Sequence, residues 1–264
     1  MAPAAPPLPR LLFVHGMWST SAVWDAWRPR FEARGFATEA LSLPGHGGDS
    51  DRLDGLGLEE CARAVEQAID RRPGPVALIG HSMGGLLCQQ VAARRPLAAL
   101  VLVCSAAPAP VFPQRPAMWP ALLHHFMRWG SWRGQFRLSR READALLLNA
   151  VPAPARATLF ASMQAESGRL AWQASFGPLN WSGSNRVDVA AVRCPMLALA
   201  GLQDRIVPPG VSRALARLYG KRLDYREQAQ HGHWPLAAEP GWQRRADEVA
   251  DWLLTHTSKG AAQP

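Results

Sequence analysis

Ser82 is the residue of this 264-residue chain whose surroundings point most directly to chemistry. It lies at the centre of Gly80-His81-Ser82-Met83-Gly84, which is a G-x-S-x-G pattern. A neutral serine hydroxyl is a weak nucleophile, so it needs a base within hydrogen-bond distance. The base in turn needs a carboxylate that fixes its tautomer and stabilises its protonated form. The pattern therefore directs the search toward a histidine and an acid elsewhere in the chain.

The segments on either side of Ser82 indicate how it would be presented. Residues 76–79 are a short apolar run rich in branched side chains, which predicts a buried strand. Residues 83–94 contain no proline and repeat apolar side chains at helical spacing, which predicts a helix. The turn between them is sharp, and we expect glycines at 80 and 84 to avoid collisions and to permit unusual dihedral angles. The serine at the apex would then point outward, as in a nucleophile elbow.

Strand, elbow and helix in this order resemble the α/β-hydrolase superfamily. Two N-terminal features add to the resemblance: a strand predicted over 10–16 that ends in His15-Gly16, and the turn Pro44-Gly-His-Gly-Gly48. This turn is similar to the family's D-x-P-G-x-G-x-S, with Ser42 in place of the usual aspartate. The resemblance implies the α/β fold class, with a doubly wound, mostly parallel sheet of about six strands.

The resemblance also implies the other members of a Ser-His-Asp triad. Asp204 lies in Gly-Leu-Gln-Asp-Arg-Ile-Val-Pro, which is similar to the family's G-x-x-D-x-x-V-P, where the aspartate is the triad acid. The alternative is a loop aspartate that caps the following helix. His233 follows Gly232 after the last predicted strand and precedes a proline, as the family's base does. His231, two residues earlier, is the rival candidate.

By the same resemblance, two backbone amides would hold an oxyanion. Met83 opens the elbow helix, where the helix dipole favours negative charge. The second donor would be the amide of Met17, in the loop after the first strand. Trp18, His81 and Trp234 are the candidate substrate-binding residues, and Trp18 would form a wall of the site. His81 also has a structural interpretation, through packing.

Strands and helices alternate on both sides of a long irregular segment, which predicts a parallel sheet covered on both faces. Further strands are expected at 38–43, 98–104, 195–201 and 222–227. Further helices are expected from Ser19 or Thr20 to Arg34, and at 59–72, 209–218 and 240–255.

The alternation stops between residues 108 and 187, where prolines recur and short amphipathic pieces lie at 119–129, 139–150 and 154–166. We therefore expect an α/β-hydrolase core formed by residues 1–107 and 188–264, with a helical cap at 108–187. The cap holds five tryptophans, at 119, 129, 132, 172 and 181. It also holds nine arginines against three carboxylates: Arg115, Arg128, Arg133, Arg137, Arg140, Arg141, Arg156, Arg169 and Arg186 against Glu142, Asp144 and Glu166.

Composition argues against nucleic-acid binding, membrane insertion and export. The net charge is +8, but only Lys221 and Lys259 are lysine, so arginine enrichment explains the charge and no nucleic-acid motif accompanies it. The chain has no uninterrupted run of 18 apolar residues, so no membrane span is expected. The N-terminal segment, Met1 to Pro9, is interrupted by prolines and does not resemble a signal peptide, so we expect a cytoplasmic location.

The cysteines, which lack metal-binding spacing, are expected to be buried free thiols: Cys61, Cys88, Cys104 and Cys194.

The leading interpretation is a serine hydrolase that cleaves carboxylic esters of short to medium acyl length and needs no metal or organic cofactor. A serine at position 82 argues against the dehalogenase and epoxide-hydrolase branches, which use a carboxylate nucleophile. The alternative is a thioesterase that acts on acyl groups carried by coenzyme A or an acidic carrier protein, because the basic cap would attract an anion. A third hypothesis is a non-catalytic ligand receptor with the same fold. The substrate and the oligomeric state stay open.

Overall fold

The computed structural model describes residues 7–112, 125, 130, 132–234 and 236–257. Its centre is a six-stranded sheet in the order β2-β1-β3-β4-β7-β8, and every neighbouring pair in it is parallel. This confirms the predicted fold class. The strands are β1 (Arg10–Val14), β2 (Thr38–Leu41), β3 (Val76–His81), β4 (Ala99–Val103), β7 (Met196–Gly201) and β8 (Leu223–Gln228).

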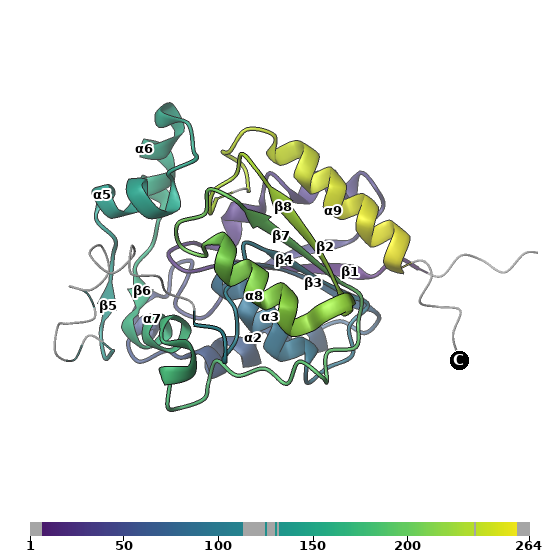
Figure 1. Cartoon of the computed structure of the whole chain (residues 1–264), viewed down its shortest axis with the longest axis horizontal. Coiled ribbons are helices and arrows are strands. Elements are labelled where there is room, and N and C mark those ends of the chain that lie inside the picture. The colour runs from purple at the N-terminus through teal and green to yellow at the C-terminus, as the bar shows by residue number, and fades with distance from the viewer. Residues whose placement is uncertain (1–6, 113–124, 126–129, 131, 235, 258–264) are drawn as a thin grey trace, which may run out of the picture.

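Helices cover both faces of the sheet, because successive side chains of a strand point to opposite sides. In β1, Leu11 and Phe13 belong to one apolar cluster, and Leu12 and Val14 belong to another. The first cluster includes side chains of α1 (Arg28–Glu32) and α9 (Trp242–Thr257). The second includes side chains of α2 (Leu58–Asp70), α3 (Met83–Ala92) and α8 (Pro209–Tyr219). The two layers of helices are visible on either side of the sheet (Figure 1).

The first helix differs from the prediction. In place of one helix over residues 19–34, a single turn of 3-10 helix, η1 (Ser21–Trp24), precedes the short helix α1. Pro29 explains the interruption, because it has no N–H and its ring would clash with the carbonyl four residues earlier in a continuous helix. Of the two expected capping residues, Thr20 is the one whose side chain accepts a hydrogen bond, from the amide of Ala22 at 3.3 Å.

Between β4 and β7 the chain leaves the sheet, and residues 108–187 are called the insertion below. Its short elements lie together beside the sheet (Figure 1). They are β5 (Gln135–Phe136), α5 (Arg140–Glu142), the short π-helix η4 (Ala143–Leu147), α6 (Ala153–Ser162), β6 (Glu166–Ser167), α7 (Gly168–Ser175) and η5 (Gly177–Leu179).

Two predictions for the insertion need correction, and a third is not addressed. The helix expected over 139–150 is divided into α5 and η4. The helix expected over 154–166 ends at Ser162, because Met163 is extended (φ −67°, ψ 138°). Glu166 therefore lies in β6, which pairs with β5 in antiparallel fashion. The piece expected over 119–129 falls outside the described residues, apart from position 125.

Two expectations from composition can be compared with the described part of the chain. No helix in it is long and apolar enough to cross a membrane. All four cysteines are free, as predicted: Cys61, Cys88 and Cys104 are buried, and Cys194 is half-buried.

The crossing of α3 over the sheet leaves no room for side chains. A Cβ added at Gly84 would meet the carbonyl groups of Val14 and His15, at the end of β1. A Cβ added at Gly80 would lie 2.6 Å from the carbonyl oxygen of Gly84. Neither glycine has a positive φ. The expectation that they permit unusual dihedral angles is therefore wrong, and close backbone approach is the reason for both.

Replacing Gly84 with alanine should lower the free energy of unfolding by about 1–3 kcal/mol, because the added methyl group can be accommodated only if backbone shifts. Urea unfolding measures the loss. Gly134→Ala is the matched control, since a Cβ there meets nothing within 4 Å. Equal stabilities for the two variants would show that α3 does not depend on this close approach.

Candidate active site

Ser82 occupies a strained turn between β3 and α3. Its φ of 54° and ψ of −123° are dihedrals that residues with a side chain rarely adopt, at a cost of about 1–3 kcal/mol. Backbone hydrogen bonds hold the turn: the Ser82 amide donates to Val103 (3.1 Å), and its carbonyl accepts from Gly85 (3.0 Å) and Ala106 (2.9 Å). The unusual dihedral angles thus fall on the serine itself, as in a nucleophile elbow.

A chain of hydrogen bonds links Ser82 to the predicted base and acid. His233 Nε2 lies 3.0 Å from Ser82 Oγ, and His233 Nδ1 lies 2.8 Å from Asp204 Oδ2. A carboxylate only accepts, so the proton of a neutral imidazole sits on Nδ1, and Nε2 is left to accept from the serine hydroxyl. The structure thus brings together the three side chains that the sequence analysis assigned to a triad.

The acid is itself held in place. Asp204 Oδ1 accepts hydrogen bonds from the amides of Ile206 and Val207, both at 2.8 Å. All three members of the chain are nearly inaccessible, with 7% of Ser82, 4% of Asp204 and 1% of His233 exposed. Asp204 thus uses one oxygen for its own loop and the other for His233.

The sheet brings these residues together from distant parts of the sequence. Ser82 follows β3, Asp204 follows β7 and His233 follows β8, and the carboxyl ends of parallel strands lie at one edge of a sheet. The loops after β7 and β8 also touch, because a Cβ at Gly201 would meet the carbonyl groups of His231 and Gly232. Because Gly201 has no side chain, the loop that carries Asp204 can pack against the loop that carries His233.

His231, the rival base, has a different partner. Its Nδ1 lies 3.2 Å from Glu239 Oε2. Glu239 is fully buried and also accepts hydrogen bonds from the amides of Gly232 and Trp234, both at 3.0 Å. This carboxylate therefore fastens the loop on both sides of His233. Sequence reasoning missed Glu239, since a lone glutamate before a helix carries no distinctive pattern.

The two residues expected to supply amides to an oxyanion adjoin the elbow, Met83 directly after Ser82 and Met17 directly after Gly16, which packs against Ser82. Met83 is the first residue of α3. A Cβ at Gly16 would lie only 2.7 Å from Ser82 Cβ, so the loop that continues into Met17 passes directly beside the elbow. Within the described residues, the hydrogen bonds use neither the amide of Met17 nor that of Met83.

His81 contacts the backbone of the predicted base. Its ring is buried, and its Nε2 lies 2.8 Å from the carbonyl oxygen of His233, to which it donates. This contact agrees with the structural interpretation of His81, and its role in substrate binding stays a prediction.

Trp18 and Trp234 belong to one apolar cluster that the insertion shares with the core. Trp18 is 5% exposed and lines a small cavity of about 150 Å³ with residues of the insertion: Arg137, Leu138, Phe160, Ala161, Met163 and Gln164. Trp234 is 3% exposed and packs edge-on against the ring of His81. The cavity beside Trp18 is thus the candidate binding space.

A second cavity lies far from Ser82, and the described residues form no candidate metal site. A larger cavity, of about 1200 Å³, is lined by Pro75, Leu97 and Pro195, at the opposite edge of the sheet from Ser82. Over the described ranges, no group of three or more His, Cys, Asp or Glu side chains could hold a metal ion.

The sequence matches known hydrolases along most of its length. Residues 11–252 match the model of a family described as the alpha/beta hydrolase family. A pimeloyl-[acyl-carrier protein] methyl ester esterase of Neisseria meningitidis is 30% identical over 251 residues, which cover 87% of this chain and 73% of that protein. A pyrethroid hydrolase of Sphingobium wenxiniae is 33% identical over 103 residues, which cover 38% of this chain and 37% of that protein.

Solved structures resemble the whole fold. A monoacylglycerol lipase of Paleococcus ferrophilus superimposes with a TM-score of 0.72 at 21% identity, covering 94% of this chain and 96% of that one. A pyrethroid hydrolase of Sphingobium faniae gives a TM-score of 0.70 at 21% identity, covering 97% of this chain and all of that one. At such identities the likeness shows the fold alone.

The buried histidines around the site should make stability depend on pH. Burial, and then the neighbouring His233, lowers the pKa of His81 to about 3. Burial, and then His46, lowers the pKa of His15 to about 3, although a hydrogen bond to the backbone of Gly16 opposes the shift. Both rings therefore stay neutral in the folded protein over a range where an unfolded histidine is protonated.

Because the unfolded state binds more protons below about pH 6.5, the free energy of unfolding should fall on acidification, by up to about 1.4 kcal/mol per pH unit for each such histidine. His81→Gln removes one of the two contributions, so its urea-unfolding free energy should depend less steeply on pH between about 4 and 6.5. All other titrating groups are shared by the two proteins. Identical slopes would mean that His81 is not held neutral.

Proposed function

The chain belongs to the alpha/beta hydrolase family, and we propose that it is a serine hydrolase of carboxylic esters with Ser82, His233 and Asp204 as its catalytic triad. The observation that carries the proposal is the hydrogen-bond chain from Ser82 Oγ through both ring nitrogens of His233 to Asp204. A hydroxyl, a base and an acid in this relation are the parts that acyl transfer requires.

In the first half of the reaction, Ser82 Oγ attacks the ester carbonyl carbon while His233 Nε2 takes its proton. The π electrons of the carbonyl move onto its oxygen, and the amides of Met17 and Met83 hold the resulting oxyanion. Asp204 stabilises the imidazolium that forms and keeps its Nδ1 proton in place. When the tetrahedral intermediate collapses, the bond to the alcohol oxygen breaks and His233 gives that oxygen the proton.

In the second half, a water molecule replaces the alcohol and the same groups act again. His233 removes a proton from the water as its oxygen attacks the acyl-enzyme carbonyl. The bond to Ser82 Oγ then breaks, and His233 returns the proton to Oγ. The products are a carboxylic acid and the free serine. The reaction is a hydrolysis, so no electrons are exchanged and no redox cofactor takes part.

The insertion is proposed to act as the cap that defines the substrate. Its side chains form most of the cavity of about 150 Å³ beside Trp18, which favours a short or medium acyl chain. The cavity is largely apolar, so binding would rest on burial of hydrocarbon, worth roughly 25 cal/mol per Å². Trp18 would form its wall on the side of the core.

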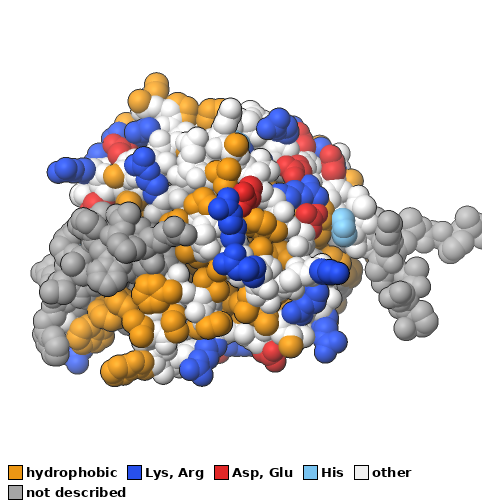
Figure 2. Space-filling view, viewed as in Figure 1, with side chains coloured by type: hydrophobic (Ala, Val, Ile, Leu, Met, Phe, Trp, Pro, Cys, Tyr) orange, Lys and Arg blue, Asp and Glu red, His pale blue; other side chains and the backbone are white. Residues whose placement is uncertain are grey.

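A second candidate is an acyl group delivered on an acidic carrier or on coenzyme A. Four arginines of the insertion are exposed and make no ion pair with other described residues: Arg133, Arg137, Arg141 and Arg186. The Neisseria relative bears the name of an esterase for a carrier-bound methyl ester. Against this, basic side chains are scattered across the visible face among acidic ones, with no single basic patch (Figure 2). A neutral ester is therefore the leading candidate.

His233→Ala should lower kcat/KM for p-nitrophenyl esters by about 10³-fold or more, because the serine loses its base. His231→Ala should cost much less, about tenfold or below, since His231 touches Glu239 and not the serine. Ser82→Ala, which should also lose labelling by a fluorophosphonate probe, serves as the null reference. The opposite ranking of the two histidine variants would refute the assignment of the base.

Ionic strength should separate the two substrate classes. With p-nitrophenyl esters of graded chain length, KM should fall with acyl length until the cavity is full, and salt should have little effect. With acyl thioesters of coenzyme A, steering by charge would make kcat/KM fall steeply as salt rises from about 10 mM to 0.5 M. Reversing Arg137 and Arg141 to glutamate should then matter only for the anionic substrate. Efficient, salt-sensitive thioester cleavage beside poor ester cleavage would overturn the preference for neutral esters.

A further inference from the structure

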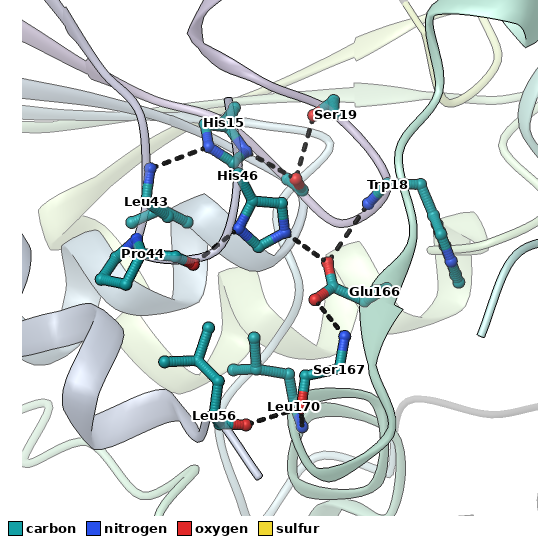
Figure 3. A network of polar contacts seen from close by, with 11 residues as sticks. His15, Trp18, Ser19, Leu43, Pro44, His46, Leu56, Glu166, Ser167 and Leu170 are labelled. Atoms are coloured by element: carbon teal, nitrogen blue, oxygen red, sulfur yellow. Dashed lines mark hydrogen bonds and ion pairs between the residues drawn. The ribbon is translucent and has the colours of Figure 1, made fainter. Parts of the chain in front are cut away.

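Glu166 of the insertion reaches the loop that follows β1. Its side chain is fully buried and lies among residues of three separate segments: the loop after β1, the turn after β2 and the start of α7 (Figure 3). One carboxylate oxygen, Oε2, is 3.2 Å from the amide nitrogen of Trp18 and 3.2 Å from His46 Nε2. The other, Oε1, accepts from the amide of Ser167 at 2.7 Å.

The partners of His46 require both of its ring nitrogens to donate. Nδ1 lies 2.9 Å from the carbonyl oxygen of Pro44, and Nε2 faces the carboxylate of Glu166. With Glu166 ionised neither partner can donate a proton, so the protonated ring satisfies both contacts and then forms a buried ion pair with Glu166. Burial lowers the pKa of His46, but the hydrogen bond and charge of Glu166, followed by Pro44 and Asp49, outweigh it and raise the pKa overall.

The insertion holds Trp18 by both of its backbone polar groups. The amide donates to Glu166, and the carbonyl accepts from the amide of Gln164 at 2.9 Å. Trp18 needs such support because its φ is +58°, a left-handed conformation that bulky side chains disfavour.

The peptide just before Trp18 is oriented from the other side. The carbonyl oxygen of Gly16 accepts from His15 Nδ1 at 2.8 Å and from Ser19 Oγ at 2.9 Å. His15 in turn accepts from the amide of Leu43 through Nε2. In a trans peptide the N–H points away from the carbonyl, so these bonds fix the direction of the Met17 amide. Glu166 fixes the next peptide, between Met17 and Trp18.

We infer that Glu166 is a positioning residue that holds the Met17–Trp18 segment in the conformation that presents the Met17 amide to an oxyanion. The inference rests on the proposed function for its catalytic consequence, whereas the hold on the loop follows from the contacts alone. Through Glu166, docking of the insertion on the core completes the oxyanion site as well as the binding cavity.

The test compares Glu166→Gln with wild type in two independent measurements. The amide side chain has one acceptor oxygen where the carboxylate has two, so the bonds to Trp18, His46 and Ser167 cannot all be kept. Hydrogen exchange followed by mass spectrometry should show faster exchange, by about tenfold or more, in peptides covering residues 15–20, while peptides of α9 are unchanged. This readout is independent of any enzymatic activity.

The kinetic measurement uses p-nitrophenyl butyrate and a trifluoromethyl ketone inhibitor, which mimics the tetrahedral intermediate. Removal of an oxyanion donor typically costs about 10²–10³-fold in kcat. Misplacement of the Met17 amide should therefore lower kcat by about tenfold or more, with KM within about twofold and inhibitor affinity reduced by the same factor as kcat. Loss of packing alone would change KM or the amount of folded protein instead.

Glu59→Gln is the matched control, since it removes a carboxylate from the surface ion pair with Arg94 and should change neither measurement. If Glu166→Gln does not fold, the double variant Glu166→Gln with His46→Gln replaces it, because it leaves no unpaired buried charge. The same changes are expected there. Unchanged exchange in residues 15–20, or faster exchange with an unchanged kcat, would overturn the inference. A wild-type protein inactive on every ester would instead refute the proposed function.

Discussion

The close approach of α3 to the end of β1 is the constraint on which the rest of the site depends. Backbone meets backbone there, since Gly84 leaves no space between the helix and the carbonyl groups of Val14 and His15. This contact brings the elbow at Ser82 against Gly16 and hence against the loop that continues β1. If α3 lay farther from β1, the Ser82 hydroxyl would be separated from the Met17 amide that is proposed to act with it.

Two buried glutamates stabilise the two loops that flank Ser82. Glu239 accepts two amides and a ring nitrogen in the loop that carries His233. Glu166 accepts the amide of Trp18, in the segment that carries Met17, and faces a ring nitrogen of His46 in the turn after β2. Each carboxylate pairs with a histidine outside the proposed triad, and each satisfies backbone donors that would otherwise be buried without partners. Rigidity at the site thus comes from acids that do no chemistry themselves.

The sheet could be predicted because its strands are buried apolar runs, and the candidate triad of Ser82, Asp204 and His233 could be proposed because their motifs resemble those of a known family. The sequence analysis did not predict the break before α1, where Pro29 interrupts the expected helix, or the extended backbone of Glu166, where β6 pairs with β5. The contact of Glu166 with His46, 120 residues away, could not be recognised because neither residue lies in a motif that indicates such a partner.

The double attachment of the insertion limits how such enzymes can be recombined. Exchange of residues 108–187 for a corresponding segment of another hydrolase would replace the walls of the cavity, which is the usual aim of such a graft. The same exchange would also remove the carboxylate that faces His46 and the amide of Gln164 that supports Trp18. A donor segment lacking both would leave the buried Nε2 of His46 and the backbone groups of Trp18 without these partners. Compatibility with the recipient's first loop, rather than pocket shape alone, therefore decides which chimeras fold and act.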